Sequence, residues 1–335
     1  GWTSPAVIGE LTGGIVLLGL FTLIEFRSPA PMFRLQLFRI RSFTSGVLAS
    51  FLAALGRGGL MFMLIIWLQG IWLPRHGFDF ARTPLWAGIY MVPLTAGLLF
   101  AGPASGFLSD RFGSRPFATG GMVVSAGAFV ALELLPINFV YWQFALVLLV
   151  AGLAMGIFGS PNRAGVMNSL PPQHRGAGSG MNSTFQNSAQ VLSIGIFFSL
   201  MIAGLAADLP GALYHGLVAQ GVPTTVAGRV AHLPPVSTLF AAFLGENPMQ
   251  HLLGPAVLSH LSAAHQAALT GRSFFPSLIS PPFQKGLHEA FDFAIAACLV
   301  AAGASWLRDG KYVYREAEVD APVPATEPEP VGAGR

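Results

Sequence analysis

The chain reads Gly-Phe-Leu-Ser-Asp-Arg-Phe-Gly-Ser-Arg-Pro from Gly106 to Pro116, a charged turn between two long apolar stretches. Charged side chains are costly inside hydrocarbon, so such a cluster must lie where the chain meets water. The flanking stretches, 84–108 and 116–136, each hold enough residues to cross about 30 Å of hydrocarbon as a helix. The turn therefore marks the boundary between two membrane-spanning helices.

The same alternation of apolar stretches and short polar connections runs along most of the chain. The sequence is 53% hydrophobic and only 10% charged, and it contains 40 glycines. This balance is unlike that of a soluble globular domain and predicts an all-α polytopic membrane protein. The single cysteine, Cys298, lies in an apolar run, so neither a disulfide framework nor a thiolate metal cluster is predicted. We expect about seven transmembrane helices, at 5–26, 43–71, 84–108, 116–136, 139–160, 176–207 and 286–308.

The distribution of cations predicts the orientation of these helices. The short loops 72–83 and 136–139 hold only Arg75 and Arg82, whereas the alternate connections hold many more cations. Because Lys and Arg accumulate in cytoplasmic loops, we expect the cation-rich connections and the C-terminus to be cytoplasmic. The protein is then a multi-pass integral protein of the plasma (inner) membrane. The cations of these connections are Arg27, Arg34, Arg39, Arg41, Arg111, Arg115, Arg163, Arg175, Arg308, Lys311 and Arg315.

Two long segments do not read as spans. The outer segment 208–285 is interrupted at Glu246-Asn247-Pro248 and offers only short amphipathic pieces. The tail 316–335 alternates Glu and Pro with almost no large apolar residues, which predicts disorder. The chain opens with Gly1 and lacks a basic signal sequence, so we expect it to be part of a longer protein.

Arg57 is the most conspicuous single residue, because it lies near the middle of the second predicted span. A central arginine costs a few kcal/mol or more unless it faces water or an anionic partner. One interpretation is that it lines a cavity and binds a substrate, or pairs with an acid involved in coupling. The alternative is a structural ion pair, or a hydrogen-bonded anchor to helix carbonyls.

A polar stripe on the sixth predicted span is the second candidate. Its members fall within an arc of about 80° at roughly 100° per residue, and amides at membrane depth must face protein or water. The stripe either lines a path through the membrane or joins this helix to a neighbour by hydrogen bonds. Gln69, at the outer part of the second span, is a weaker candidate of the same kind. The stripe consists of Ser179, Asn182, Gln186, Gln190 and Ser193.

Glycines four residues apart predict close contacts between helices. Such pairs let two backbones approach, as a bundle in lipid requires. They occur at Gly9/Gly13, Gly102/Gly106, Gly152/Gly156 and Gly176/Gly180.

Several classes of site find no support. The histidines do not repeat at a metal-ligand spacing, and no loop of the Gly-x-x-x-x-Gly-Lys-Ser/Thr type would cradle a nucleotide. No paired carboxylates or His/Asp cluster lie at membrane depth, so neither catalytic residues nor a proton-carrying acid can be nominated. We therefore expect no enzyme activity, no cofactor, no metal and no nucleic-acid partner.

The charged turn also carries a resemblance. Its spacing, Gly-x-x-x-Asp-Arg-x-Gly-x-Arg, resembles the cytoplasmic loop of the major facilitator superfamily of transporters. The stretches 25–43, 68–70, 87–93, 170–176 and 240–248 resemble its fourteen-span drug:proton antiporter branch. The resemblance implies that residues 1–42 form a linker transmembrane helix and a basic loop, and that residues 43–315 form the C-terminal six-helix half. It also implies that the N-terminal half is missing here.

Within that family the turn would act as a gating loop formed by Gly106, Asp110, Arg111, Gly113 and Arg115. Asp110 would cap the next helix, and the two arginines would bind acids or helix ends on the cytoplasmic face. Ser114 departs from the pattern, since the family often has a basic residue there. The loop is either a latch or only a topological anchor.

The function that the resemblance implies is secondary active transport: proton-coupled efflux of hydrophobic or amphipathic drugs by alternating access. The implied partners are the lipid bilayer, a small substrate, protons and the missing half, and helix positions within the family favour Arg57 as a cavity residue. The alternative is a seven-helix receptor or sensor, although no lysine lies in the middle of the last span to hold a retinal.

Overall fold

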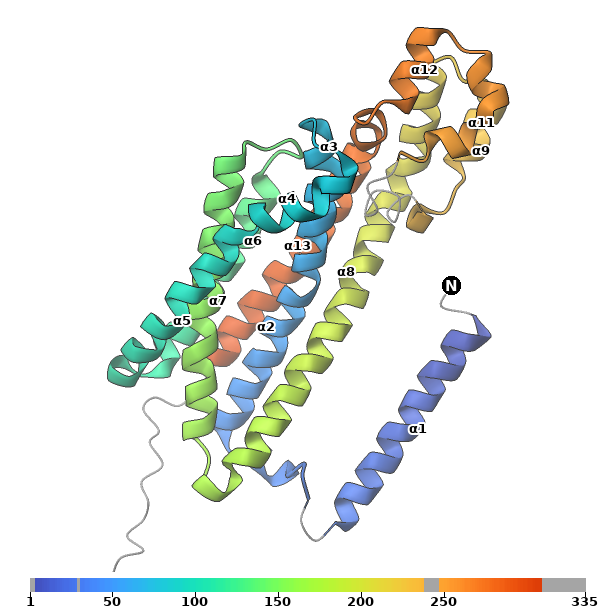
Figure 1. Ribbon diagram of the computed structural model, residues 1–335. Coiled ribbons are helices and arrows are strands. Elements are labelled where there is room, and N and C mark those ends of the chain that lie inside the picture. The colour runs from blue at the N-terminus through green and yellow to red at the C-terminus, as the bar shows by residue number, and fades with distance from the viewer. Residues whose placement is uncertain (1–3, 29–30, 238–246, 309–335) are drawn as a thin grey trace, which may run out of the picture.

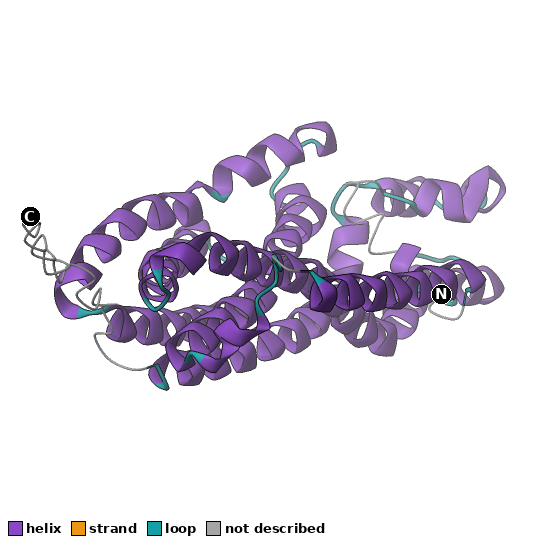
Figure 2. Cartoon of the chain, turned by 90° about the horizontal axis from the view of Figure 1, so that it is seen from below, coloured by secondary structure: helices purple, strands orange, loops and turns teal. Residues whose placement is uncertain are grey.

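The computed structural model describes residues 4–28, 31–237 and 247–308, and within these ranges it contains helices and no strand (Figures 1 and 2). Seven helical stretches of the described chain are long and apolar enough to cross a membrane. The prediction of an all-α polytopic membrane protein is thus confirmed. The tail 316–335 and residues 240–246 of the run that carried part of the resemblance lie outside the described residues.

Each predicted span corresponds to one of these stretches, and the α2 stretch continues through a π-helical turn at Trp67–Trp72. The spanning helices are α1 (Pro5–Arg27), α2 (Arg41–Ile66) with α3 (Leu73–Arg75), α4 (Thr83–Tyr90) with α5 (Val92–Phe112), α6 (Ser114–Leu134), α7 (Tyr141–Asn168), α8 (Arg175–Ala219) and α13 (Phe274–Trp306).

Three helices extend well beyond the predicted bounds. Helix α7 continues eight residues past 160 to Asn168, α8 continues twelve past 207 to Ala219, and α13 begins twelve before 286 at Phe274. Hydropathy detects only the part of a helix that lies in hydrocarbon, whereas the backbone remains helical in water beyond it. Both ends of the predicted outer segment 208–285 are therefore helical, with α9 (Thr224–Ala231), α11 (Met249–Ser259) and α12 (Ala263–Thr270) between them.

The bundle has two distinct ends. The connection from α1 to α2, the turn from α5 to α6, the connection from α7 to α8 and the end of α13 lie together at the lower end in Figure 1. We call this the basic end, because it carries the cation-rich connections. The long extensions of α8 and α13, with the short helices between them, project from the opposite end (Figure 1).

Glycines allow the closest helix contacts. A Cβ atom added to Gly152 of α7 would lie 2.0 Å from the carbonyl oxygen of Leu94 in α5. A Cβ on Gly204 of α8 would lie 2.6 Å from the Cα of Gly286 in α13. In lipid, helices associate mainly through such close packing, so these crossings hold the bundle together.

Two tryptophans fix α2 and the following turn at the opposite end. Trp67 and Trp72 are buried, and their Nε1 atoms donate to the carbonyl oxygens of Ile137 (3.0 Å) and Phe139 (2.9 Å). Phe139 also stacks on Trp72, with ring centroids 5.2 Å apart. These rings pack within the protein, and each buried N–H has its acceptor.

Helix α1 stands beside the bundle and buries none of its side chains (Figure 1). It is linked to the rest through Phe33, whose ring meets Phe21 edge-on at 6.3 Å and whose backbone N–H donates to the Glu25 carboxylate. An apolar helix with no buried face is suited to lipid on nearly all sides.

Candidate functional site

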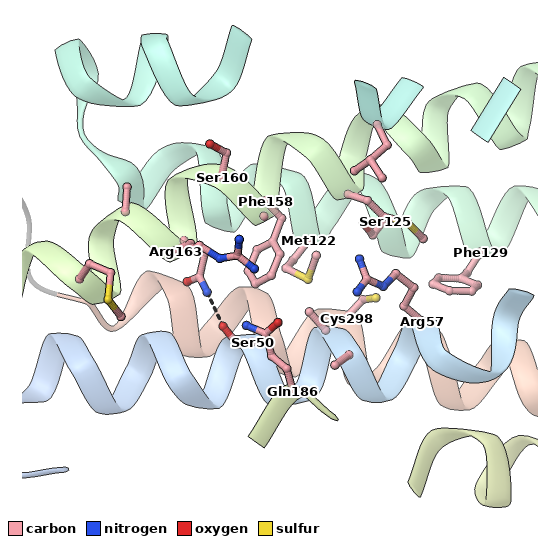
Figure 3. A pocket seen from close by; sticks show the side chains of 18 residues that line it. Ser50, Arg57, Met122, Ser125, Phe129, Phe158, Ser160, Arg163, Gln186 and Cys298 are labelled. Atoms are coloured by element: carbon pink, nitrogen blue, oxygen red, sulfur yellow. Dashed lines mark hydrogen bonds between the residues drawn. The ribbon is translucent and has the colours of Figure 1, made fainter. Parts of the chain in front are cut away.

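A cavity of about 670 Å³ lies among α2, α6 and α7, with single contributions from α5, α8 and α13 (Figure 3). This is within the range of small-molecule sites in proteins. Its wall combines methionine, phenylalanine and alanine side chains with serines, amides and two arginines. Such a mixture suits a ligand with an apolar body and few polar groups.

Arg57 lies on the wall of this cavity, and its guanidinium group points into it (Figure 3). It follows Arg41, the first residue of α2, by sixteen residues, which places it roughly 24 Å along the helix. Among the described residues it has no ion pair. Gly56 beside it packs on α13, since a Cβ there would lie 3.5 Å from the Ala294 carbonyl oxygen.

A second arginine, Arg163, lines the same cavity from α7 (Figure 3). The sequence predicts that Arg163 lies in a connection beyond a span that ends at 160. Helix α7 instead continues through Pro161 to Asn168, so Arg163 belongs to the spanning helix. The sequence gives little signal for this role, because a cation just after a span is typical of a cytoplasmic boundary.

The polar stripe on α8 divides between two tasks. Gln186 lines the cavity, whereas Ser193 is fully buried and joins α8 to α2. The Ser193 hydroxyl donates to the Leu55 carbonyl oxygen and accepts from the Gly59 N–H at 2.8 Å. Gln186 thus lies on the cavity wall, and Ser193 forms a hydrogen-bonded contact between two helices.

The other amide candidates lie outside the cavity lining. Asn182 is buried on α8, and its Oδ1 has no partner among the described residues. Gln190 is exposed, and a Cβ on Gly58 would lie 2.8 Å from its carbonyl oxygen, so only its backbone is closely packed. Gln69 lies half-buried in the π-helical turn near the opposite end.

The predicted gating loop is a very tight turn at the basic end. Gly113 alone separates α5 from α6, with φ 90° and ψ 155°, a conformation that favours glycine. Gly106, six residues before the end of α5, faces α7: a Cβ there would lie 2.8 Å from the Ser160 hydroxyl oxygen. Gly113 is thus required for the backbone turn, whereas Gly106 is required for close packing against α7.

One expectation about this turn is wrong. Asp110 lies inside α5, exposed in its last turn, and α6 begins without a side-chain cap. The single-residue connection through Gly113 is too short to bring Asp110 in front of the next helix. Asp110 has no ion pair with a described residue.

The cations of the turn differ in their contacts. Arg111 is exposed and approaches the ring of its neighbour Phe112, with 5.7 Å from Cζ to the centroid. Arg115 lies over the ring of Trp306 at the end of α13, with 4.3 Å between Cζ and the centroid. Arg115 therefore links the beginning of α6 to the end of α13 by a cation–π contact.

Arg308, just beyond α13, forms a buried polar cluster beside the cavity. Its Nη2 donates to Asn162 Oδ1, and its Nη1 lies 3.5 Å from the Ser114 hydroxyl. Asn162 Nδ2 in turn donates to Ser50 Oγ at 2.6 Å and to the Gly46 carbonyl oxygen at 3.2 Å. The cluster joins α2, α6, α7 and α13 at the basic end, and burial lowers the pKa of Arg308 to about 10.

Several known proteins are similar to this chain in sequence. The sequence profile of the Major Facilitator Superfamily matches residues 1–194. The chain is 28% identical over 212 residues to the methyl viologen resistance protein SmvA of Salmonella typhimurium, covering 63% of this chain and 41% of that protein. It is 26% identical over 328 residues to the tetracenomycin C resistance and export protein of Streptomyces glaucescens, covering 97% of this chain and 55% of that protein. It is 26% identical over 242 residues to the multidrug efflux pump LfrA of Mycolicibacterium smegmatis, covering 68% of this chain and 46% of that protein.

The chain thus spans between 41% and 55% of the length of these relatives. Its spanning helices, the charged turn between α5 and α6 and the profile match over more than half of its residues agree with one another. The chain belongs to the Major Facilitator Superfamily.

Proposed function

We propose that this chain is part of a secondary active transporter that exports hydrophobic or amphipathic compounds by alternating access. The observation that carries this proposal is the mainly apolar cavity of about 670 Å³ among membrane-spanning helices, with Arg57 on its wall and no described ion-pair partner. Proteins similar to this chain are named for resistance, export and multidrug efflux. Protons are the proposed coupling ion.

The proposed domain division follows the packing. Helix α1, within residues 1–42, buries no side chain and would act as a linker helix, while the six spans within 43–315 would form one transporter half. The missing half would close the open side of the cavity. A seven-helix receptor is less well supported, because only six of the seven candidate spans bury residues within the bundle.

The basic end would face the cytoplasm of the cell, with the protein in the plasma membrane. There Arg115 and Trp306, together with the Arg308 cluster, would act as a latch that keeps α6 and α13 together in one conformer. A contact of this kind can be broken and remade without unfolding a helix, as alternating access requires. Asp110 and Arg111 have no described ion pair, and their partners would lie on the missing half.

The test is transport by the full-length protein in inverted membrane vesicles. An imposed pH gradient, acidic inside, should drive accumulation of an amphipathic fluorescent dye, and a protonophore should abolish it. Arg115→Ala should lower the rate several-fold, because a cation–π contact of about 0.5–2 kcal/mol is lost. Arg229→Gln is the matched control, since Arg229 is exposed on α9, away from the cavity and from the basic end. The proposal would be refuted if dye accumulation were the same with and without the pH gradient, and with and without the protein.

A further inference from the structure

The wall of the cavity is cationic. Two of the side chains that line it are arginines, Arg57 and Arg163, and among the described residues none of the others is Asp or Glu. The nearest acid before Cys298 on α13 is Asp292, which lies roughly 9 Å further toward the opposite end and is not part of the lining. The cavity therefore presents positive charge to whatever enters it.

The two arginines lie at different depths. Asn162, next to Arg163, donates to Ser50 at 2.6 Å, so Arg163 lies at about the level of Ser50 on α2. Arg57 follows Ser50 by seven residues, which is about 10 Å along the helix axis. In Figure 3 both side chains extend into the cavity from different helices.

Apolar side chains line the space between the two cations. Met122 and Phe158 lie between Arg163 and Arg57, and Phe129 lies beyond Arg57 (Figure 3). The sulfur and ring surfaces can accommodate a flat or irregular apolar body. The arrangement as a whole matches a molecule with an apolar body and a negatively charged group.

We propose that the cavity selects amphipathic organic anions, meaning a ring or alkyl body that carries a carboxylate or a similar acidic group. Arg163 would receive the anion near the basic end, and Arg57 would hold it at mid-membrane depth. Arginine suits this task because its guanidinium stays charged and can bind a carboxylate through two parallel hydrogen bonds. A cation entering the same space would meet two uncompensated positive charges, which disfavours it. This inference rests on the proposed export function for its physiological meaning.

An alternative would neutralise Arg57 with an acid from the missing half. The two possibilities differ in their consequences. If an acid of the protein pairs with Arg57, the pair is neutral and the unaltered protein should show no preference for anions over cations. If the arginine binds the ligand, its removal affects anions and spares cations.

The experiment measures binding of two dyes to the purified full-length protein. Fluorescein is an anion and rhodamine 6G is a cation, and both share a xanthene body. Fluorescein should bind at least tenfold more tightly. Arg57→Gln and Arg163→Gln should each weaken fluorescein binding about tenfold, because each removes a hydrogen-bonded charge, and should leave rhodamine 6G binding unchanged or tighter, because each also removes a repelling charge. Arg57→Lys should recover part of the loss, and Arg229→Gln should change neither dye.

Three results would overturn the inference: tighter binding of rhodamine 6G, equal losses for both dyes in the glutamine variants, or no fluorescein binding by the unaltered protein. Thermal unfolding of each variant checks that it is folded. If Arg57→Gln does not fold, Arg57→Lys still provides the comparison. Vesicle transport of the same dyes separates the two proposals. Selective fluorescein binding without transport would leave anion selection standing and remove export, whereas preferential export of rhodamine 6G would do the reverse.

Discussion

At the scale of single residues, the Arg308 cluster shows how a charge is kept inside the basic end. Arg308 is only 3% exposed, and its described partners are the neutral oxygens of Asn162 and Ser114. Burial lowers its pKa to about 10, so the guanidinium remains protonated at neutral pH. Because no described carboxylate balances the charge, the hydrogen bonds must offset its desolvation.

Removing the Asn162 amide should therefore destabilise the protein strongly. Asn162→Ala would leave the Arg308 Nη2 group buried without its acceptor and would also remove the bond to Ser50. We expect a loss of roughly 3 kcal/mol in unfolding free energy, since hydrogen bonds to charged groups contribute about 1.5–3 kcal/mol. The measurement is unfolding of the full-length protein in detergent.

The matched control is Asn168→Ala, which changes an exposed asparagine at the end of the same helix and should shift stability by less than about 0.5 kcal/mol. Asn162→Asp should be less harmful than Asn162→Ala, because it supplies a carboxylate to Arg308, although it loses the hydrogen bond to the Gly46 carbonyl oxygen. Equal stability of Asn162→Ala and Asn168→Ala would show that the cluster contributes little.

The sequence revealed some site residues and hid others for a physical reason. Arg57 could be singled out because a cation in the middle of an apolar stretch has no ordinary explanation. Asn162 and Arg163 follow a predicted span end, where polar residues are common, so their position in the wall of a cavity was not apparent. The continuation of α7 through Pro161 buries Asn162 in the bundle and brings Arg163 to the wall of the cavity.

At the scale of helices, glycine spacing predicted close contacts only in part. Gly152 and Gly156 do pack tightly, but their neighbours are Leu94 and Ala101 on α5. Gly9, Gly13, Gly102, Gly176 and Gly180 have no neighbour within 4 Å of an added Cβ. The spacing identifies a smooth helix face, whereas the partner of that face depends on how the helices are arranged, which a single sequence does not encode locally.

This difference can be tested with two glycines in neighbouring helices. Gly152→Ala would place a methyl group 2.0 Å from the Leu94 carbonyl oxygen, which forces α5 and α7 apart, and we expect a loss of at least about 2 kcal/mol. Gly127→Ala in α6 meets nothing within 4 Å and should be neutral or stabilising by up to about 1 kcal/mol, through helix propensity alone.

Thermal unfolding of the two variants in the same detergent provides the comparison. An unchanged unfolding midpoint for Gly152→Ala would mean that α5 and α7 can move apart at little cost in stability. A marked loss for Gly127→Ala would instead point to a partner for the exposed face of α6.

At the scale of the whole molecule, the order of spans and the gathering of cations at one end could be predicted, because both follow from the cost of placing charge in hydrocarbon. The cavity could not be predicted, since it requires residues from six helices whose mutual positions arise from packing. The helical extensions at the opposite end were also missed, because hydropathy carries no signal for a helix in water.

Cysteine labelling at the two ends of the bundle tests the proposed orientation in the membrane. Gln173, between α7 and α8, is exposed at the basic end, and His260, after α11, is exposed beyond the opposite end. With Cys298 replaced by serine in an otherwise cysteine-free protein, a membrane-impermeant maleimide should label His260→Cys in intact cells. Gln173→Cys should react only after permeabilisation if the end rich in Arg and Lys faces the cytoplasm, as we propose. The reverse pattern would invert the molecule and make the cavity an entry route from outside, so the labelling bears directly on the proposed direction of transport.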